Sequence, residues 1–460
     1  MKFCKNKRIL RPKRMLAAAL LCLLASTGLW TLPALGGAGQ AGWLTPQMKL
    51  RGGMLGQSGI SLDLNGDGLE DLVVGAPYAQ YQGAIGALFI YAGTPKGLAS
   101  RPAVFWGGDG NLGWSLAALG NLYGKGRAAF AASAFSGSSG SGSRTGTVTI
   151  YQIMGNKLQK LTVLSGENAM DKFGYSLAVG DLNGDGSPDL IVGAPFHSPS
   201  TAYYQQGAVY IFFGPAYNPA RAIKIPASSY HGGIGFSLAA GDINGDGIDD
   251  LLIGASGRVC VYYGAQGGYF TPNLTGPAAV FRSADSGFGR AIAVLGDLNG
   301  DGLKEVAVGA NQATVNNVID SGRLFIFKGG AGKRTVNGDS PSVDLLAKID
   351  GEPNCGRFAS AILPVGDLDG DGIPELAVSA IHADGNPWPV TGKIFLFSGG
   401  TLTSTASVAT AQAFSGDAGN MHLGSFLALV NKGTGLAAGA PMENANTGKI
   451  RFYPLPMNGQ

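Results

Sequence analysis

The chain has few of the residues on which many catalytic sites depend. Among its 460 residues there are only four cysteines and four histidines, and charged residues make up 14%. No HExxH or HxH spacing occurs, so the sequence does not indicate a zinc-protease type of metal site. No GxSxG motif follows a strand and opens a helix, which argues against a serine hydrolase with a nucleophile elbow. No long amphipathic helical pattern follows Gly42, so helical folds are disfavoured.

Basic charge is scarce once the first fourteen residues are set aside. Residues 1–14 carry seven Lys or Arg and no acid, and the remainder holds 26 basic against 30 acidic residues. A nucleic-acid-binding protein normally shows a basic patch or stripe. None follows residue 14, so we expect no nucleic-acid partner.

The basic segment continues into an apolar run from Met15 to Trp30 and then into small residues, which is the pattern of an export signal. We expect residues 1–41 to be a signal peptide, cleaved within 34–41, and residues 42–460 to form one mature domain. The alternative is an uncleaved anchor, because the run to Leu35 approaches the roughly 20 residues that span a bilayer. The mature chain is expected to be secreted, periplasmic or on the cell-envelope surface, with no integral membrane domain after cleavage.

Export would remove Cys4 and Cys22 and leave Cys260 and Cys355. A disulfide between these two is possible in an oxidising compartment. Two separate thiols, with Cys260 packed inside the apolar run VCVYY, is the interpretation we favour.

The abundant residues form a repeat. The 76 glycines and 23 prolines stand between short apolar runs, so they mark turns. The segment GDLNGDGSPDLIVGAP, residues 180–195, recurs around Asp63, Asp242, Asp297 and Asp367. Asn121 and Asn431 begin two further copies that have lost the acidic side chains, and successive copies start 55 to 70 residues apart. The sequence therefore contains seven repeats, numbered here as blades 1 to 7.

Each full repeat has four apolar segments of strand length; in blade 3 they begin near residues 173, 189, 207 and 220. This predicts an all-β fold, a seven-bladed β-propeller of four-stranded antiparallel blades. Blade 7 lacks its fourth segment, whereas Gln47–Gly53 resembles one. We therefore expect the ring to be closed by an N-terminal strand that completes the last blade.

The conserved spacing within the repeat predicts a calcium loop. Side-chain oxygens at positions 1, 3, 5 and 9 and a backbone carbonyl at position 7 can surround a hard cation, with a glycine at position 6 for the sharp turn. Up to five Ca²⁺ ions are predicted. The predicted ligands are Asp63, Asn65, Asp67, Leu69 and Asp71; Asp181, Asn183, Asp185, Ser187 and Asp189; Asp242, Asn244, Asp246, Ile248 and Asp250; Asp297, Asn299, Asp301, Leu303 and Glu305; and Asp367, Asp369, Asp371, Ile373 and Glu375.

Phe173-Gly174, Gly193-Ala194-Pro195 and the DxNxDGxxD loop between them resemble the FG-GAP repeats of integrin alpha-subunit propellers. The resemblance covers about residues 47–457. It implies calcium in the loops on one face of the ring and ligand contacts on the opposite face.

Several aromatic and histidine residues fall in segments expected on that opposite face, and exposed aromatic side chains often anchor interfaces. The candidate ligand-binding residues are Tyr78, Tyr81, His197, Tyr203, Tyr204, His382 and Trp388. We expect an exported adhesion or interaction module that binds a protein or a glycan. The alternative is a propeller-based hydrolase or lyase that acts on an extracellular polymer, and a purely architectural envelope protein is a third possibility.

Overall fold

The structure is a computed structural model that describes residues 42–44, 52–81, 83–108, 110–122, 128–138, 144–154, 157–198, 206–227, 233–268, 276–353, 356–383, 390–402, 406–416 and 421–455. The chain separates into two units, Met1–Leu35 and Gly36–Gln460, and every described residue belongs to the second. The predicted signal segment therefore lies outside the described residues. Within the described ranges, no helix is both long and apolar enough to cross a bilayer.

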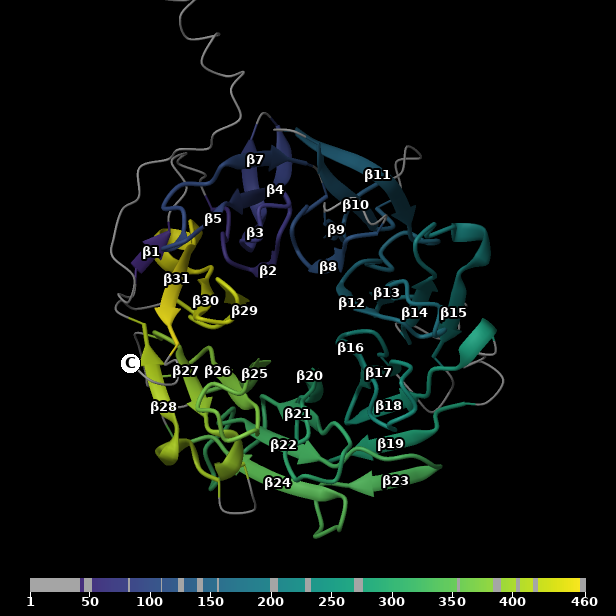
Figure 1. The fold of residues 1–460 in the computed structure, drawn as a ribbon, viewed down its shortest axis with the longest axis vertical. Coiled ribbons are helices and arrows are strands. Elements are labelled where there is room, and N and C mark those ends of the chain that lie inside the picture. Colours follow the sequence, from purple (N-terminus) through teal and green to yellow (C-terminus); the bar gives the residue numbers. More distant parts are fainter. Residues whose placement is uncertain are drawn as a thin grey trace, which may run out of the picture. The chain divides into compact units, whose positions relative to one another are not determined.

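Seven sheets stand around one axis in the second unit, which confirms the predicted all-β seven-bladed propeller (Figure 1). The innermost strands surround that axis and are β2 (Ser58–Leu62), β8 (Leu116–Gly120), β12 (Ser176–Gly180), β16 (Leu238–Gly241), β20 (Phe288–Val294), β25 (Phe358–Gly366) and β29 (Leu427–Val430). The second strands are β3 (Asp71–Tyr81), β9 (Ala129–Ala134), β13 (Asp189–Ala194), β17 (Asp250–Ala255), β21 (Val306–Ala310), β26 (Glu375–Ala380) and β30 (Gly435–Ala440).

The outer half of each blade is formed by two further strands. The third strands are β4 (Ala84–Tyr91), β10 (Thr147–Met154), β14 (Ala208–Phe212), β18 (Arg258–Tyr262), β22 (Arg323–Phe327), β27 (Lys393–Phe397) and β31 (Lys449–Pro454). The fourth strands are β7 (Val104–Gly107), β11 (Lys157–Ser165), β15 (Ile223–Pro226), β19 (Ala279–Arg282), β24 (Leu345–Asp350), β28 (Gln412–Ser415) and β1 (Gly42–Leu44). The remaining described elements are short: β5 (Gly93–Thr94), β6 (Gly97–Leu98), β23 (Arg334–Asn337), the one-turn helix α3 (Glu443–Asn446), and the 3₁₀ turns η1 (Pro219–Arg221), η2 (Gln266–Gly268), η3 (Gly399–Thr401) and η4 (Val408–Thr410).

An N-terminal strand lies beside the last blade. Strand β1 pairs antiparallel with β31, with Trp43 opposite Arg451. The segment predicted to do this was Gln47–Gly53, of which residues 47–51 lie outside the described residues. The strand next to β31 therefore comes from earlier in the chain than the sequence pattern indicated.

The structure departs from the four-strand pattern in two blades. In blade 4, β23 pairs parallel with β19 and forms a fifth strand. In blade 1, the second strand β3 is longer than its counterparts and continues through Tyr78 as far as Tyr81. The register shifts between Ala76 and Gln80, so Pro77 stands at an irregularity of the ladder, where a residue without an N–H group is tolerated.

In blade 3 the Phe-Gly and Gly-Ala-Pro segments pack together, and the Gly-Ala-Pro segment also approaches blade 4. The Phe173 ring is fully buried and meets the Tyr210 ring edge-on, with 5.3 Å between centroids. The N–H of Gly174 donates to the carbonyl of Gly193 at 3.0 Å. A Cβ on Gly193 would stand 2.3 Å from the carbonyl oxygen of Gly235 in blade 4, so only glycine permits this close approach.

Six of the seven second strands are buried along their length, and β3 is buried as far as Pro77, because neighbouring blades cover both faces of these strands. Strand β13, for example, is buried at all six positions, which explains its continuous apolar sequence DLIVGA. Cys260 lies in β18 as a buried free thiol, and Cys355 lies outside the described residues. The apolar core is thus distributed between blades, so candidate polar sites are to be found in the loops at the blade ends.

Candidate functional site

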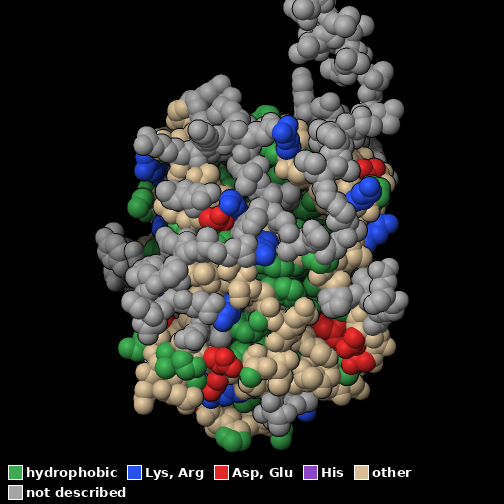
Figure 2. Space-filling view, turned by 90° about the vertical axis from the view of Figure 1, so that its left-hand side faces the viewer, with side chains coloured by type: hydrophobic (Ala, Val, Ile, Leu, Met, Phe, Trp, Pro, Cys, Tyr) green, Lys and Arg blue, Asp and Glu red, His purple; other side chains and the backbone are tan. Residues whose placement is uncertain are grey.

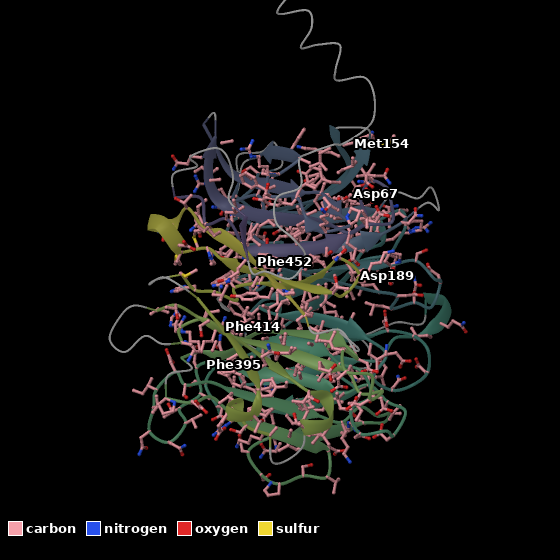
Figure 3. The ribbon with its side chains drawn as sticks, turned by 60° about the vertical axis from the view of Figure 1, so that its left-hand side comes forward. Asp67, Met154, Asp189, Phe395, Phe414 and Phe452 are labelled. Carbon is pink, nitrogen blue, oxygen red and sulfur yellow. The ribbon has the colours of Figure 1, made fainter. Side chains whose placement is uncertain are left out.

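The five predicted loops connect the first and second strands of blades 1, 3, 4, 5 and 6, so the antiparallel topology places them all at one end of the blades. Asp67 of blade 1 and Asp189 of blade 3 lie toward the same side of the view in Figure 3. The loops that follow the second strands, and the connections between blades, lie at the opposite end. The molecule therefore has a loop face and an opposite face.

The position-1 aspartate folds the loop back on itself. Asp63 accepts hydrogen bonds from the N–H groups of Gly66 at 2.7 Å and Gly68 at 2.8 Å. The bond from the position-6 glycine recurs in every loop, at 2.8 to 3.0 Å; the donors in the other four are Gly186, Gly247, Gly302 and Gly372. Backbone hydrogen bonds therefore hold the position-1 aspartate side chain in place without the help of an ion.

Positions 3, 5 and 7 form a short chain of hydrogen bonds. In blade 4, Asn244 Oδ1 accepts from the N–H of Asp246 at 2.9 Å, and Asp246 Oδ1 accepts from the N–H of Ile248 at 2.9 Å. The other four loops repeat both bonds at 2.7 to 3.1 Å. The position-7 residues thus use their N–H groups to orient position 5, while the calcium-binding role of their carbonyl oxygens stays a prediction.

The position-9 carboxylate is buried and fastens the loop to the blade. Asp250 Oδ2 accepts from the N–H of Ile243 at position 2, and Oδ1 accepts from the N–H of Gly264, both at 3.0 Å. The first bond recurs in all five loops, and the second recurs in blades 1, 3 and 6, where the donors are Gly93, Gly214 and Gly399. Sequence reasoning missed this second role, although the glycine two residues after the third strand of these four blades is a visible signal for it.

Burial opposes ionisation of the position-9 carboxyl groups in blades 1, 3, 4 and 5. It raises the pKa of Asp71 to about 6 and that of Asp189, Asp250 and Glu305 to about 7. Backbone N–H groups pull these pKa values down, and the carboxylates at positions 1 and 5 push them up further. A cation bound near Asp71, Asp189, Asp250 or Glu305 would therefore favour the ionised form of that side chain.

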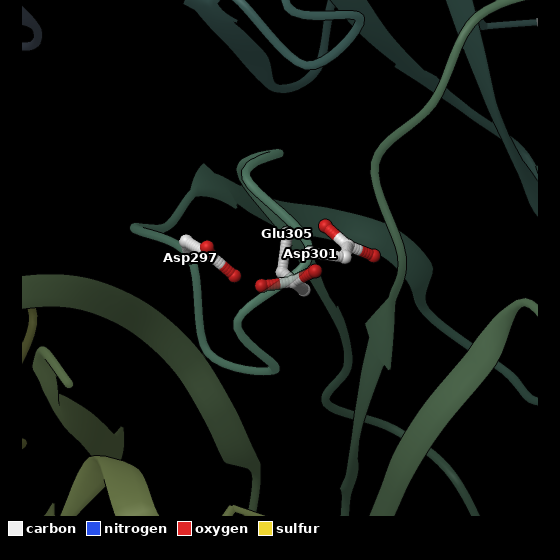
Figure 4. A group of neighbouring side chains, drawn as sticks. All are labelled: Asp297, Asp301 and Glu305. Carbon is white, nitrogen blue, oxygen red and sulfur yellow. The ribbon is translucent and has the colours of Figure 1, made fainter.

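In two of the five loops, those of blades 5 and 6, the donor geometry fits one hard dication. Carboxylate oxygens of Asp297, Asp301 and Glu305 lie within 4.8 Å of one another (Figure 4), as do those of Asp367, Asp369 and Glu375. Oxygens that bind one calcium ion at about 2.3–2.6 Å can be no more than about 5 Å apart. In both loops, a single ion can contact all three carboxylates.

In blade 7, a turn at Asn431–Thr434 without acidic side chains takes the place of the acidic loop. Asn431 Nδ2 donates to Thr434 Oγ1 at 2.7 Å, and Asn431 and Lys432 both have left-handed φ angles near 57°. The N–H of Lys432 donates to Glu70 Oε2 of blade 1 at 3.0 Å. The predicted loss of the ligand set in this blade agrees with its geometry.

Six aromatic side chains gather on the opposite face of blades 1 to 4. They are Tyr78, Trp114, Phe135, Tyr175, Phe196 and Phe236, and we call them the aromatic patch. The Tyr175 ring stands 5.3 Å from Trp114 and 5.5 Å from Phe236, centroid to centroid. The other three rings lie 4.7 to 6.5 Å from these.

Two cations border the aromatic patch. Lys172 Nζ lies 4.3 Å from the centroid of Phe196, and the Arg290 guanidinium lies 4.2 Å from that of Phe236. Tyr78 is 38% exposed and most of the other rings are half-buried. Sequence reasoning missed Trp114, Tyr175 and Phe236, which share the position directly after the Phe-Gly-type turn.

The structure describes four of the seven predicted ligand-binding residues. Tyr78 belongs to the aromatic patch, and Tyr81 lies at the end of β3. His197 is only 2% exposed, and its Nδ1 lies 2.7 Å from Asp171 Oδ2, so it is part of the packed interior. His382 lies beside His422, with 4.7 Å between ring centroids. Tyr203, Tyr204 and Trp388 lie outside the described residues.

Charge on the face seen in Figure 2 is mixed. Among the side chains described there, Lys and Arg are interspersed with Asp and Glu, and neither sign forms a continuous stripe. This view gives no support to a nucleic-acid partner.

The repeats match a known class of sequence. The FG-GAP repeat family matches residues 55–88, 173–212 and 288–333, and the FG-GAP-like repeat family matches residues 242–308. The chain therefore contains FG-GAP repeats, and the matched segments include the acidic loops of blades 1, 3, 4 and 5.

The relatives found among characterised proteins are integrin alpha subunits. The chain is 32% identical over 234 residues to integrin alpha-5 of Xenopus laevis, which covers 46% of this chain and 20% of that protein. It is 34% identical over 180 residues to integrin alpha-PS5 of Drosophila melanogaster (37% of this chain and 18% of that one) and 36% identical over 168 residues to human integrin alpha-7 (34% and 14%). The chain thus spans a fifth or less of the length of these relatives, and it resembles them as a seven-bladed propeller.

Proposed function

We propose that this chain is an exported, calcium-stabilised propeller that binds a protein ligand through the aromatic patch. The observation that carries the proposal is the patch itself, because six contacting rings from neighbouring blades meet on one face with cations at their edge. Aromatic residues and arginine are the side chains that most often dominate binding energy at protein interfaces. The resemblance to integrin alpha subunits supports an adhesion or interaction role.

Calcium has a structural role in this proposal. With dissociation constants of the extracellular type, near 10⁻⁴–10⁻³ M, and millimolar calcium, each loop contributes about 0.4–1.4 kcal/mol, or about 2–7 kcal/mol for five. That sum is comparable with the net stability of a typical protein. The ions hold the loop face, and the ligand is bound on the opposite one.

The ligand is proposed to be a protein and not a glycan. The patch combines apolar rings with the flanking cations Lys172 and Arg290. This combination suits apolar and acidic side chains of a protein surface.

The test is capture of an envelope extract on the immobilised mature chain in calcium. We expect retained material to be protein and to be lost with a Tyr78→Ala, Phe196→Ala double variant. A Val163→Ala variant is the matched control, because Val163 is a 50% exposed apolar residue on the outer strand β11. Equal melting temperatures would show that all three proteins are folded.

Other outcomes would count against the proposal. Retention that the double variant keeps would place the binding elsewhere, and retention of glycans alone would identify the other ligand class. The hydrolase or lyase alternative is checked on the same preparation, with extracellular polymers as substrates. Turnover that survives purification would replace the binding-module proposal.

A further inference from the structure

Three basic side chains meet on the opposite face of blades 6 and 7, away from both the metal loops and the aromatic patch. His382 follows β26, Arg357 precedes β25, and His422 precedes β29. The His382 and His422 rings are 4.7 Å apart and tilted by 47°. Both histidines are half-buried, and the Arg357 side chain is 35% exposed, so the group can be reached from solvent.

The repeat geometry explains why these residues converge. Arg357 and His422 occupy the position before the Phe-Gly-type turn, which Lys172 occupies in blade 3, and His382 occupies the position of Phe196. In blade 3 this arrangement puts the Lys172 ammonium 4.3 Å from the Phe196 ring. Blade 6 thus contributes the Arg357 guanidinium and the His382 imidazole, and blade 7 contributes the His422 imidazole.

Arg357 supplies the permanent positive charge of this group, because its guanidinium stays protonated. Burial, followed by the neighbouring Arg357 and His422, lowers the pKa of His382 to about 4, whereas Asp320 opposes the shift. Burial and then Arg357 lower the pKa of His422. These four residues are the charged and titratable groups that bear on the two imidazoles in the described part of the chain.

Arg357 has an unused hydrogen-bond donor. Its Nε is buried and has no hydrogen-bond partner among the described residues. The Asp320 carboxylate is 3.6 Å from this atom, which is too long for a hydrogen bond, and its side chain is 39% exposed. A buried donor without an acceptor costs free energy, so an acceptor that entered this space would be stabilised.

We propose that Arg357, His382 and His422 form a binding site for an oxyanion with the chemistry of sulfate, phosphate or a carboxylate. The guanidinium suits a carboxylate or a tetrahedral anion because it donates two hydrogen bonds in a planar fork. The same positive charge disfavours a metal dication between the two histidines. The site is independent of the aromatic patch, since it uses other blades.

An anion bound here makes the imidazoles easier to protonate, and protonated imidazoles donate hydrogen bonds to it. By linkage, affinity rises as the pH falls below neutrality toward the pKa of His382, which is about 4. Sulfate is the appropriate probe because its charge does not change across this pH range. Phosphate is less suitable, because its second pKa is about 6.

The test is an NMR titration of the imidazoles in the mature, calcium-loaded protein with labelled histidine. The chain has only four histidines, so the signals can be assigned with single variants. About 50 mM sodium sulfate is compared with about 150 mM sodium chloride, which has the same ionic strength. We expect sulfate to raise the pKa of His382 and of His422 by about 0.5–1 unit.

Arg357→Gln should abolish the response to sulfate, whereas Arg282→Gln, an exposed arginine at the end of β19, should leave it intact. The buried His197 signal reports whether each variant is folded.

If Arg357→Gln does not fold, His422→Asn replaces it, because Asn111 occupies the same position in blade 2 with a φ of 68°. That variant should at least halve the shift at His382. Equal pKa values in the two salts, or a shift that survives these variants, would overturn the proposal.

Discussion

Asp249 in blade 4 holds the acidic loop of blade 3 that begins at Asp181. Its Oδ2 accepts a hydrogen bond from the N–H of Asp181 at 3.0 Å, and its own N–H donates to the carbonyl of Asp181 at 3.0 Å. Asp249 is at position 8 of its loop, and Glu70, at position 8 in blade 1, similarly reaches the N–H of Lys432 in blade 7. In blades 1 and 4, the position-8 carboxylate thus links its loop to the blade before it.

We expect Asp249→Ala to weaken the loop of blade 3, although the residue belongs to blade 4. Loss of one charged acceptor should lower the free energy of unfolding by about 1–3 kcal/mol. Thermal unfolding in calcium measures this. Lys304→Ala is the control, because Lys304 has the same position in blade 5 and is exposed; an equal effect of both changes would contradict the linkage.

Positions 5 and 9 of one loop should respond differently to the same change. Asp250→Asn leaves only one acceptor for two backbone donors, so it should destabilise the fold by about 1–3 kcal/mol with or without calcium. Asp246→Asn keeps an acceptor for Ile248 on an exposed side chain, so it should matter only when calcium is present. Unfolding of both variants in calcium and after metal removal distinguishes these roles. Equal calcium dependence would refute the assignment.

The stability of the metal-free protein should fall as the pH rises. Asp71, Asp189, Asp250 and Glu305 have folded-state pKa values of about 6 to 7, above the ordinary values of 3.8 and 4.5. The protonated carboxyl groups favour the folded state. Their contribution to the free energy of unfolding is therefore complete below about pH 4 and is lost by about pH 7. Calcium compensates the ionised carboxylates, so the stabilisation by calcium should grow over the same range. Melting curves of metal-stripped and calcium-loaded protein test this, and a pH-independent difference would contradict it.

Strand β1 is expected to protect the edge of blade 7. A chain that begins at residue 52 leaves β31 without the partner seen at Gly42–Leu44. It should melt at a lower temperature than a chain that begins at residue 42. Removal of residues 458–460 is the control, and equal effects of the two truncations would exclude closure by β1.

The sequence predicted the parts of the molecule that repeat. The Phe173-Gly174 turn, the Asp181 loop and β13 occur in register several times, so the blade plan and the loop residues could be derived without coordinates. Features that occur once could not. Strand β1 has three residues, β23 adds to a neighbouring blade, and the partner of His197 is Asp171, 26 residues away. The contact between Trp114 and Tyr175 depends on how adjacent blades face each other, which only the ring determines.

The number of calcium ions bound to the mature chain tests the central claim most directly. Metal-stripped protein would be dialysed to equilibrium against millimolar calcium, the bound ions counted from the difference in calcium across the membrane, and the affinities measured by calorimetric titration. The account predicts five ions per chain and four for an Asp297→Ala, Asp301→Ala variant, whose two carboxylates belong to one loop. A chain that binds no calcium, or a variant that binds as many ions as the parent, would contradict it.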